Sequence, residues 1–298
     1  MKGNSIIYYC YCLIILGIVH PFVWGIAISD YSAEVNDRFG GGDSSFIGYG
    51  YDFSGVGIAS SSHWATMISN NVFISSGHLH PITNETITYW KTNDQSGSSV
   101  TRKVFEYKML GEIALGVLEN PLPDDYETYE ISSFYDKLKK LDSNGFFYNK
   151  DVFLVGKINN SSFAVGHAEI YNYGNYSTPH FHGKDSDNLK YYYTREYYND
   201  PPTTLLQNGD SGTPVFLYDS DSSSMTLLGH SFAIANIVND QGNVVGQRNY
   251  LSDLDYYRED INEFIKLHAI PEPATIIGVS PVVALGIFRF WRNRSRKS

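Results

Sequence analysis

The chain has 298 residues, of which 15% are aromatic and 18% charged, and its formal net charge at pH 7 is −10. Lys and Arg total 22 against 32 Asp and Glu, and five of the basic residues lie in the last ten positions. An acidic middle region makes nucleic acid an unfavourable partner. The length suits one large all-β domain or two small ones.

Residues 1–27 are typical of a secretory signal peptide. An apolar run over residues 6–19 follows a basic residue, and Gly25 and Ala27 are small enough for a signal peptidase. We therefore expect an exported chain whose mature form begins near Ile28. Both cysteines lie inside this segment, so the mature domain must be held together by its core without disulfides.

The next informative segment surrounds a histidine. Residues 64–68 and 72–74 predict a β-hairpin. Residues 75–77 follow it and are small enough to let the imidazole of His78 pack close to the backbone. His78 is therefore the candidate general base, with His80 as the competing candidate and a structural histidine as the alternative interpretation.

A carboxylate begins the following apolar run. Glu112 immediately precedes residues 113–118, which predict a buried strand. A charge at the head of such a strand suggests a partner, for which His78 is the candidate. A solvated charge at the strand end is the alternative.

Short runs of β-branched and aromatic residues recur between turn residues and predict an antiparallel all-β fold. They include residues 86–90, 152–155, 168–173 and 227–237. His180 and His182 have no third ligand at a recognisable spacing, so a surface loop is favoured over a metal site. Ser252 as cap and an apolar stripe over residues 254–265 predict a terminal helix.

The sequence Gly209-Asp210-Ser211-Gly212-Thr213-Pro214 places a serine on a tight turn before an apolar strand. A serine hydroxyl needs a neighbouring base, and the developing oxyanion needs backbone amide donors. Glycines let the backbone pass close to a substrate. The segment therefore predicts an acyl-transfer site with Ser211 as nucleophile, and a purely structural turn serine is the alternative.

Three of these segments resemble the motifs of trypsin-like (chymotrypsin-fold) serine peptidases. Residues 209–214 are similar to the GDSGGP motif, residues 74–78 to TAAH, and residues 112–115 to DIAL. The resemblance spans roughly residues 46–269. It implies two six-stranded antiparallel β-barrels, a site in the cleft between them, and a C-terminal helix. No cofactor or metal is implied.

The same resemblance assigns roles to individual residues. Ser211 is the expected nucleophile, His78 the general acid/base and Glu112 the orienting acid. The N–H groups of Gly209 and Ser211 are expected to form the oxyanion hole. Glu112 replaces the family's aspartate, and Thr213 replaces a glycine.

The resemblance also suggests a specificity pocket formed by Leu205, Ser231 and Phe232. Leu205 occupies the position where enzymes that prefer Lys or Arg carry an acid, so apolar or small side chains are expected instead. Asp210 pairs with a newly cut N-terminus in activated members of the family. A cut after Arg38 is one candidate for such activation.

Residues 271–298 form a second signal. Pro271-Glu272-Pro273 precedes an apolar stretch, residues 274–288, and a basic tail. This arrangement resembles the PEP-CTERM sorting signal, which exosortases process in Gram-negative bacteria. The stretch is short for a permanent span of about 20 residues, and an ordinary membrane anchor is the alternative.

These features together predict an exported serine endopeptidase, with residues 28–270 as its catalytic domain. Its expected partners are a protein or peptide substrate, a signal peptidase and an exosortase-type enzyme. The competing interpretation is a catalytically inactive trypsin-like surface module that only binds.

Overall fold

The computed structural model describes residues 26–40, 44–94, 96–132, 150–158, 162–177, 188–197, 204–219 and 223–269. These residues are mainly β-strands, and an α-helix ends the described chain. The predicted all-β class is thus confirmed. The predicted sorting segment, His180, His182 and all but the last two residues of the predicted signal peptide lie outside the described residues.

The N-terminal half supplies the first barrel. Its strands are β2 (Val56–Ala59), β3 (Trp64–Met67), β4 (Val72–Ser76), β5 (Thr86–Trp90), β6 (Ser99–Leu110) and β7 (Ile113–Leu118). They pair in the order β2-β3-β4-β7-β6-β5, and β5 pairs again with β2. Alternate residues of β5, Ile87 and Tyr89, are fully buried because successive strand side chains face opposite sides of the sheet.

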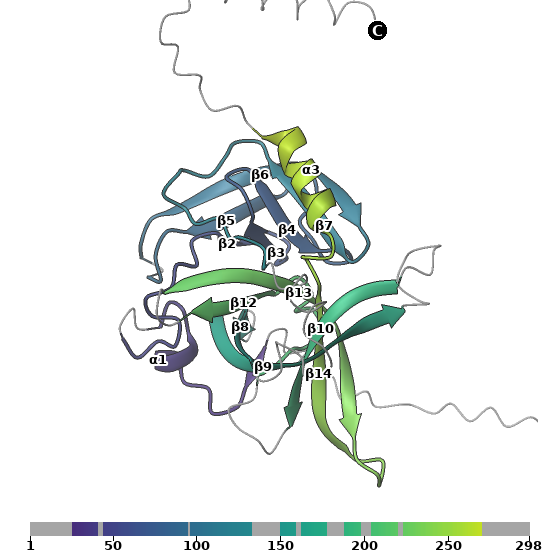
Figure 1. Cartoon of the computed structure of the whole chain (residues 1–298). Helices are drawn as coiled ribbons and strands as arrows, with labels where there is room; N and C mark the ends of the chain where they lie inside the picture. The colour runs from purple at the N-terminus through teal and green to yellow at the C-terminus, as the bar shows by residue number, and fades with distance from the viewer. Residues whose placement is uncertain are drawn as a thin grey trace, which may run out of the picture.

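The C-terminal half supplies a second set of six strands. They are β8 (Lys150–Ile158), β9 (Ser162–Ser177), β10 (Asn188–Tyr197), β12 (Pro214–Asp219), β13 (Ser224–Val238) and β14 (Val244–Ser252). Their order is β10-β14-β13-β12-β8-β9, and β9 pairs with β10. The β13–β14 hairpin extends away from the first barrel (Figure 1).

Two short strands and two helices complete the described part of the fold. β1 (Ala27–Ile28) pairs antiparallel with β11 (Thr204–Leu205) in a separate two-stranded sheet. α1 (Ala33–Asn36) is one turn long, and α3 (Arg258–His268) packs near β7 (Figure 1). α3 begins later than the sequence predicts, because Ser252 belongs to β14.

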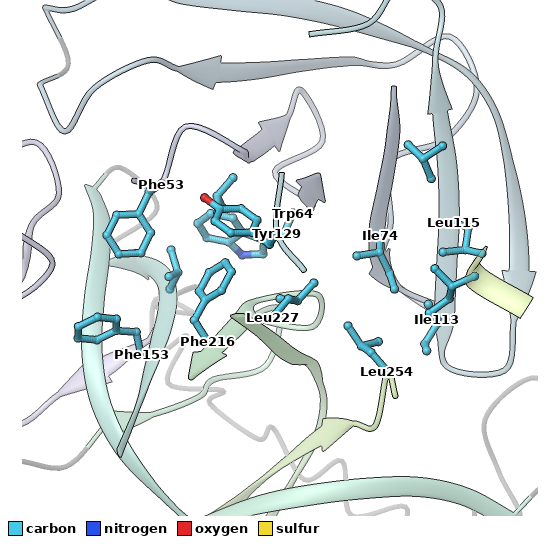
Figure 2. Close-up of a cluster of buried hydrophobic side chains, with 14 of the residues drawn as sticks. Phe53, Trp64, Ile74, Ile113, Leu115, Tyr129, Phe153, Phe216, Leu227 and Leu254 are labelled. Atoms are coloured by element: carbon cyan, nitrogen blue, oxygen red, sulfur yellow. The ribbon is translucent and has the colours of Figure 1, made fainter. Parts of the chain in front are cut away.

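The largest apolar cluster lies between the two barrels and joins them (Figure 2). Trp64, Ile74 and Leu115 come from the first barrel, and Phe153 and Phe216 come from the second. Each large apolar side chain buried in this way contributes about 1.5–3 kcal/mol. The cluster therefore fixes the two halves relative to each other and holds the ends of β4 and β7 opposite the turn that precedes β12.

Candidate active site

The first part of the site is built by pairing between β4 and β7. Ser76 is opposite Ile113 in the ladder, so the residues just beyond these positions are also neighbours. The N–H of Gly77 donates to the carbonyl of Glu112 at 2.7 Å. A Cβ on Gly77 would lie 2.6 Å from the carbonyl oxygen of Gly111, so only glycine permits this approach. Main-chain geometry thus places His78 beside Glu112.

The imidazole of His78 connects an acid to a hydroxyl. Its Nδ1 lies 2.8 Å from Oε2 of Glu112, and its Nε2 lies 2.7 Å from Oγ of Ser211. The side chains of His78 and Glu112 are only 18% and 11% exposed. When Nδ1–H donates to the carboxylate, Nε2 is left as the acceptor that faces the serine hydroxyl.

The extra methylene of a glutamate is therefore accommodated without losing contact with the histidine. Other acids lie elsewhere: the carboxylate of Asp94 accepts hydrogen bonds from Ser96, and Asp124 is exposed. The competing histidine, His80, packs against Tyr107 with ring centroids 4.5 Å apart. Within the described part of the chain, neither ring nitrogen of His80 has a hydrogen-bond partner.

Ser211 lies on a turn between β11 and β12. The turn is closed by the N–H of Asp210, which donates to the carbonyl of Gln207 at 3.1 Å, and by the N–H of Gly212, which donates to the carbonyl of Ser231 at 2.8 Å. Gly209 and Gly212 have φ values of 99° and 89°, a region that disfavours residues with a side chain. The two glycines therefore allow the sharp turn that presents the hydroxyl to His78.

Some N–H groups of this turn remain available to a ligand. The turn's own hydrogen bonds use the N–H groups of Asp210, Gly212 and Thr213. Among the described residues, none accepts a hydrogen bond from the N–H of Gly209 or Ser211. The resemblance to trypsin-like peptidases assigns these two groups to an oxyanion hole, and they lie on either side of Asp210.

Asp210 stabilises the turn from inside the protein. It is 3% exposed, and its Oδ2 accepts a hydrogen bond from the N–H of Gln207 at 2.6 Å. Burial raises the pKa of Asp210 to about 7, against the opposing effects of the Gln207 hydrogen bond and the positive charge of Lys157. Burial likewise lowers the pKa of Lys157, on β8, to about 8. In the described structure, the positive charge that acts on Asp210 is thus that of the Lys157 side chain and not that of a newly cut N-terminus.

Arg38 is buried, whereas a site of activating cleavage has to be accessible to a protease. Its side chain is fully buried, and its guanidinium donates to the carbonyl of Trp90 at 3.0 Å and to Oδ1 of Asn93 at 2.9 Å. Burial lowers its pKa to about 10. A protease could reach this arginine only after local unfolding, so the structure gives no support for a cut after Arg38.

A cavity of about 330 Å³ opens beside Ser211. The predicted residues Ser231 and Phe232 line it, but Leu205 does not: Leu206 takes its place, and Leu205 pairs with Ala27. A shift of one residue along an extended segment moves a side chain to the opposite face. The cavity lining is His78, Leu79, Leu206, Gln207, Asn208, Gly209, Asp210, Ser211, Ser231, Phe232, Ala233 and Ile234.

Ile234 lines the cavity although sequence analysis did not identify it, because it lies in a long strand where alternation alone does not show which face borders a cavity. The part of the chain that the structure describes contains no group of three or more His, Cys, Asp or Glu side chains placed to hold a metal ion. It also contains no helix long and apolar enough to cross a membrane.

The chain matches no protein-family model and has no significant match among curated proteins.

Proposed function

We propose that this chain is a serine endopeptidase with a trypsin-like fold, which hydrolyses peptide bonds through an acyl-enzyme on Ser211. One observation carries the proposal: a single imidazole, that of His78, lies 2.8 Å from a carboxylate and 2.7 Å from a serine hydroxyl. The two barrels joined by a shared core, with these residues between them, agree with the trypsin-like assignment.

The first half-reaction forms the acyl-enzyme. Oγ of Ser211 attacks the scissile carbonyl carbon while Nε2 of His78 takes the hydroxyl proton. Glu112 fixes the tautomer of His78 and stabilises the imidazolium that forms. The N–H groups of Gly209 and Ser211 stabilise the oxyanion of the tetrahedral intermediate. His78 then gives its proton to the leaving amine as the C–N bond breaks.

The second half-reaction releases the acyl group. A water molecule attacks the ester carbonyl of the acylated Ser211, and Nε2 of His78 accepts a proton from this water. The intermediate collapses, the ester bond to Oγ breaks, and the proton on His78 returns to the serine. The products are a carboxylic acid, an amine and the original enzyme.

The cavity is the proposed site for the substrate side chain that precedes the scissile bond. Leu206, Phe232 and Ile234 give it apolar walls, and Ser231 contributes a small polar residue. Among the described lining residues the one acid is Asp210, which is buried and bonded within its own turn. This composition favours apolar or small uncharged side chains over Lys or Arg.

We further propose that the peptidase is exported and acts in the cell envelope or outside it. Its partners would be a signal peptidase, an exosortase-type enzyme acting at Pro271-Glu272-Pro273, and a protein or peptide substrate. Ile26 is 2% exposed and packs in the second barrel. A signal peptidase that cuts before Ile26 would therefore leave this core contact in the mature protein. That position lies two residues before the Ile28 start that the sequence suggests.

Labelling with a fluorophosphonate probe tests the proposal. The folded chain should form one covalent adduct on Ser211, and Ser211→Ala should form none. Ser98→Ala is the control, because Ser98 is exposed and is not among the residues that line the cavity, so this variant must keep the label. A folded wild type that is not phosphonylated, or is phosphonylated on another serine, would favour the inactive binding module.

A further inference from the structure

The wall of the substrate cavity contains an unusually short strand. β11 is only Thr204–Leu205, and it is followed directly by Leu206, a residue of the cavity lining that is 1% exposed. β1 pairs with one edge of β11 through Ala27 and Ile28. Among the described strands, none pairs with the opposite edge. The main chain at Leu206 therefore needs partners of another kind.

Side chains of β14 supply these partners. Oδ1 of Asn249 accepts a hydrogen bond from the N–H of Leu206 at 3.3 Å, and Nε2 of Gln247 donates to the carbonyl of Leu206 at 2.8 Å. Nδ2 of Asn249 also donates to the carbonyl of Thr204 at 3.2 Å. Two amide side chains thus satisfy both main-chain groups of Leu206, as a neighbouring strand otherwise would.

The two amides are themselves fixed in place. Nε2 of Gln247 donates to Oδ1 of Asn249 at 2.6 Å, and Nδ2 of Asn249 donates to Oγ1 of Thr194 at 2.8 Å. Asn249 is fully buried and Gln247 is 6% exposed. Asn249 uses both of its donors and both acceptor positions, so its orientation is determined. A buried network satisfied in this way rigidifies the groups that it contacts.

The opposite side of the wall is supported by apolar packing. Ile26, just before β1, is 2% exposed and belongs to the same buried cluster as Leu206. A Cβ added to Gly156 would lie 2.4 Å from Cγ2 of Ile26, so Ile26 packs directly on that backbone. Leu206 is therefore held between an apolar contact on one side and two amides on the other.

We propose that Gln247 and Asn249 are positioning residues that set the size selectivity of the substrate cavity through Leu206. This inference rests on the proposed peptidase function. Neither amide lines the cavity or contacts the triad, so neither takes part in the chemistry. Removing their hydrogen bonds frees the main chain of Leu206 and lets the apolar wall move, while His78, Glu112 and the Ser211 turn keep their own hydrogen bonds.

The test uses Gln247→Met and Asn249→Leu, which keep approximate volume and remove the amide. Gln241→Met and Asn243→Leu are matched controls, because both residues are exposed in the turn between β13 and β14. Peptide anilides that differ only in the residue before the scissile bond, Ala, Leu or Phe, give the selectivity. A small fluorophosphonate that leaves the cavity empty reports the reactivity of Ser211.

For each variant we compare the kcat/KM of the best substrate with that of the worst. We expect this ratio to be about tenfold smaller than in wild type, mainly because KM changes. The reason is that a well-formed apolar pocket discriminates about 10–200-fold per methylene. Labelling rates and both control variants should match wild type. Gln247→Met leaves the bonds of Asn249 to Thr194, Thr204 and Leu206 in place, so it remains informative if Asn249→Leu does not fold.

Selectivity equal to wild type in folded Gln247→Met would overturn the inference. So would an equal loss of labelling rate and of activity on every substrate, which is the signature of a purely structural role. A wild type that is neither labelled nor active would overturn the proposed function and this inference together. A labelled wild type with unchanged variant selectivity would overturn only the inference.

Discussion

The two barrels hold their parts of the candidate site in different ways. In the first, His78 and Glu112 stand at the ends of paired strands, and a main-chain hydrogen bond between Gly77 and Glu112 joins them. In the second, Ser211 and the cavity wall lie on a segment held by main-chain hydrogen bonds and, in addition, by the buried polar side chains of Asp210 and Asn249. Strand pairing thus places the acid–base pair, whereas the nucleophile and the pocket depend also on buried polar side chains.

This contrast has a physical consequence. A main-chain ladder does not depend on the identity of most side chains, so the His78–Glu112 pair is sensitive to few substitutions other than those that change its own groups or fill the space at Gly77. Buried amides and carboxylates are costly when unpaired. The second half should therefore be more sensitive to single polar substitutions and to pH.

The largest expected effect is on turnover, from Glu112→Gln. The amide replaces the carboxylate that accepts from Nδ1 of His78, so the tautomer and the imidazolium lose their support. In trypsin-like peptidases, the Asp→Asn change at the orienting acid costs about ten-thousand-fold in kcat. We expect Glu112→Gln to lose roughly a hundred-fold or more in kcat on a peptide anilide near pH 8, with little change in thermal stability.

Glu112→Asp makes the same test more specific. It keeps the negative charge, but the side chain is one methylene shorter, so the carboxylate lies farther from His78. It should retain more activity than Glu112→Gln. Unchanged kcat in Glu112→Gln would mean that the first barrel does not supply the orienting acid.

The next effect concerns pH and the second barrel. Because burial raises the folded-state pKa of Asp210 to about 7, its contribution to stability is fully present below its unfolded pKa and is lost as the pH rises toward 7. Asp210→Asn removes this loss. We expect its free energy of unfolding, relative to wild type, to rise by about 3 kcal/mol between pH 4.5 and 7.5.

Urea denaturation at several pH values measures this difference. Asp94→Asn is the control, because Asp94 is exposed and bonds only within its own loop in the described structure. A relative stability of Asp210→Asn that does not change with pH would show that the carboxyl is not held in its protonated form by burial.

The smallest expected effect is that of Gly77→Ala. The new methyl group would meet the carbonyl oxygen of Gly111 at 2.6 Å, and backbone cannot move as easily as a side chain. Overpacking of this kind costs about 2 kcal/mol. We expect this loss in urea denaturation together with a reduced kcat, because displacement of Gly77 also moves His78.

Gly242→Ala is the control for losing a glycine elsewhere. Its φ of 80° is strained for alanine, but nothing lies within 4 Å of the added methyl group. It should lose about 1–2 kcal/mol of stability and keep its kcat. If Gly77→Ala and Gly242→Ala had the same kcat, the close approach of the backbone at Gly77 would not be what places His78.

The sequence was informative where the chemistry depends on local motifs. Ser211, His78 and Glu112 each sit beside small or apolar residues whose pattern is visible in a short window. The structure brings the three together although 133 residues separate His78 from Ser211. The all-β class likewise followed from short runs of β-branched and aromatic residues.

Other features depend on contacts between distant segments and leave no local pattern. Leu206 rather than Leu205 faces the cavity because β11 pairs with β1, which no short window shows. Gln247 and Asn249 look like the solvent-facing positions of a strand, yet both are buried against Leu206. Ser252 looks like a helix cap, but its hydroxyl donates to the carbonyl of His230 within the second barrel.

The central claim is that Ser211 carries the acyl group during turnover. Rapid quenching of wild type with a nitrophenyl ester, for which release of the acyl group is slow, should give a burst of nitrophenol equal to the number of active sites. Peptide mapping of the quenched protein should then find the acyl group on Ser211. Turnover without a burst, together with no acyl group on Ser211 or with the group on another residue, would contradict the account.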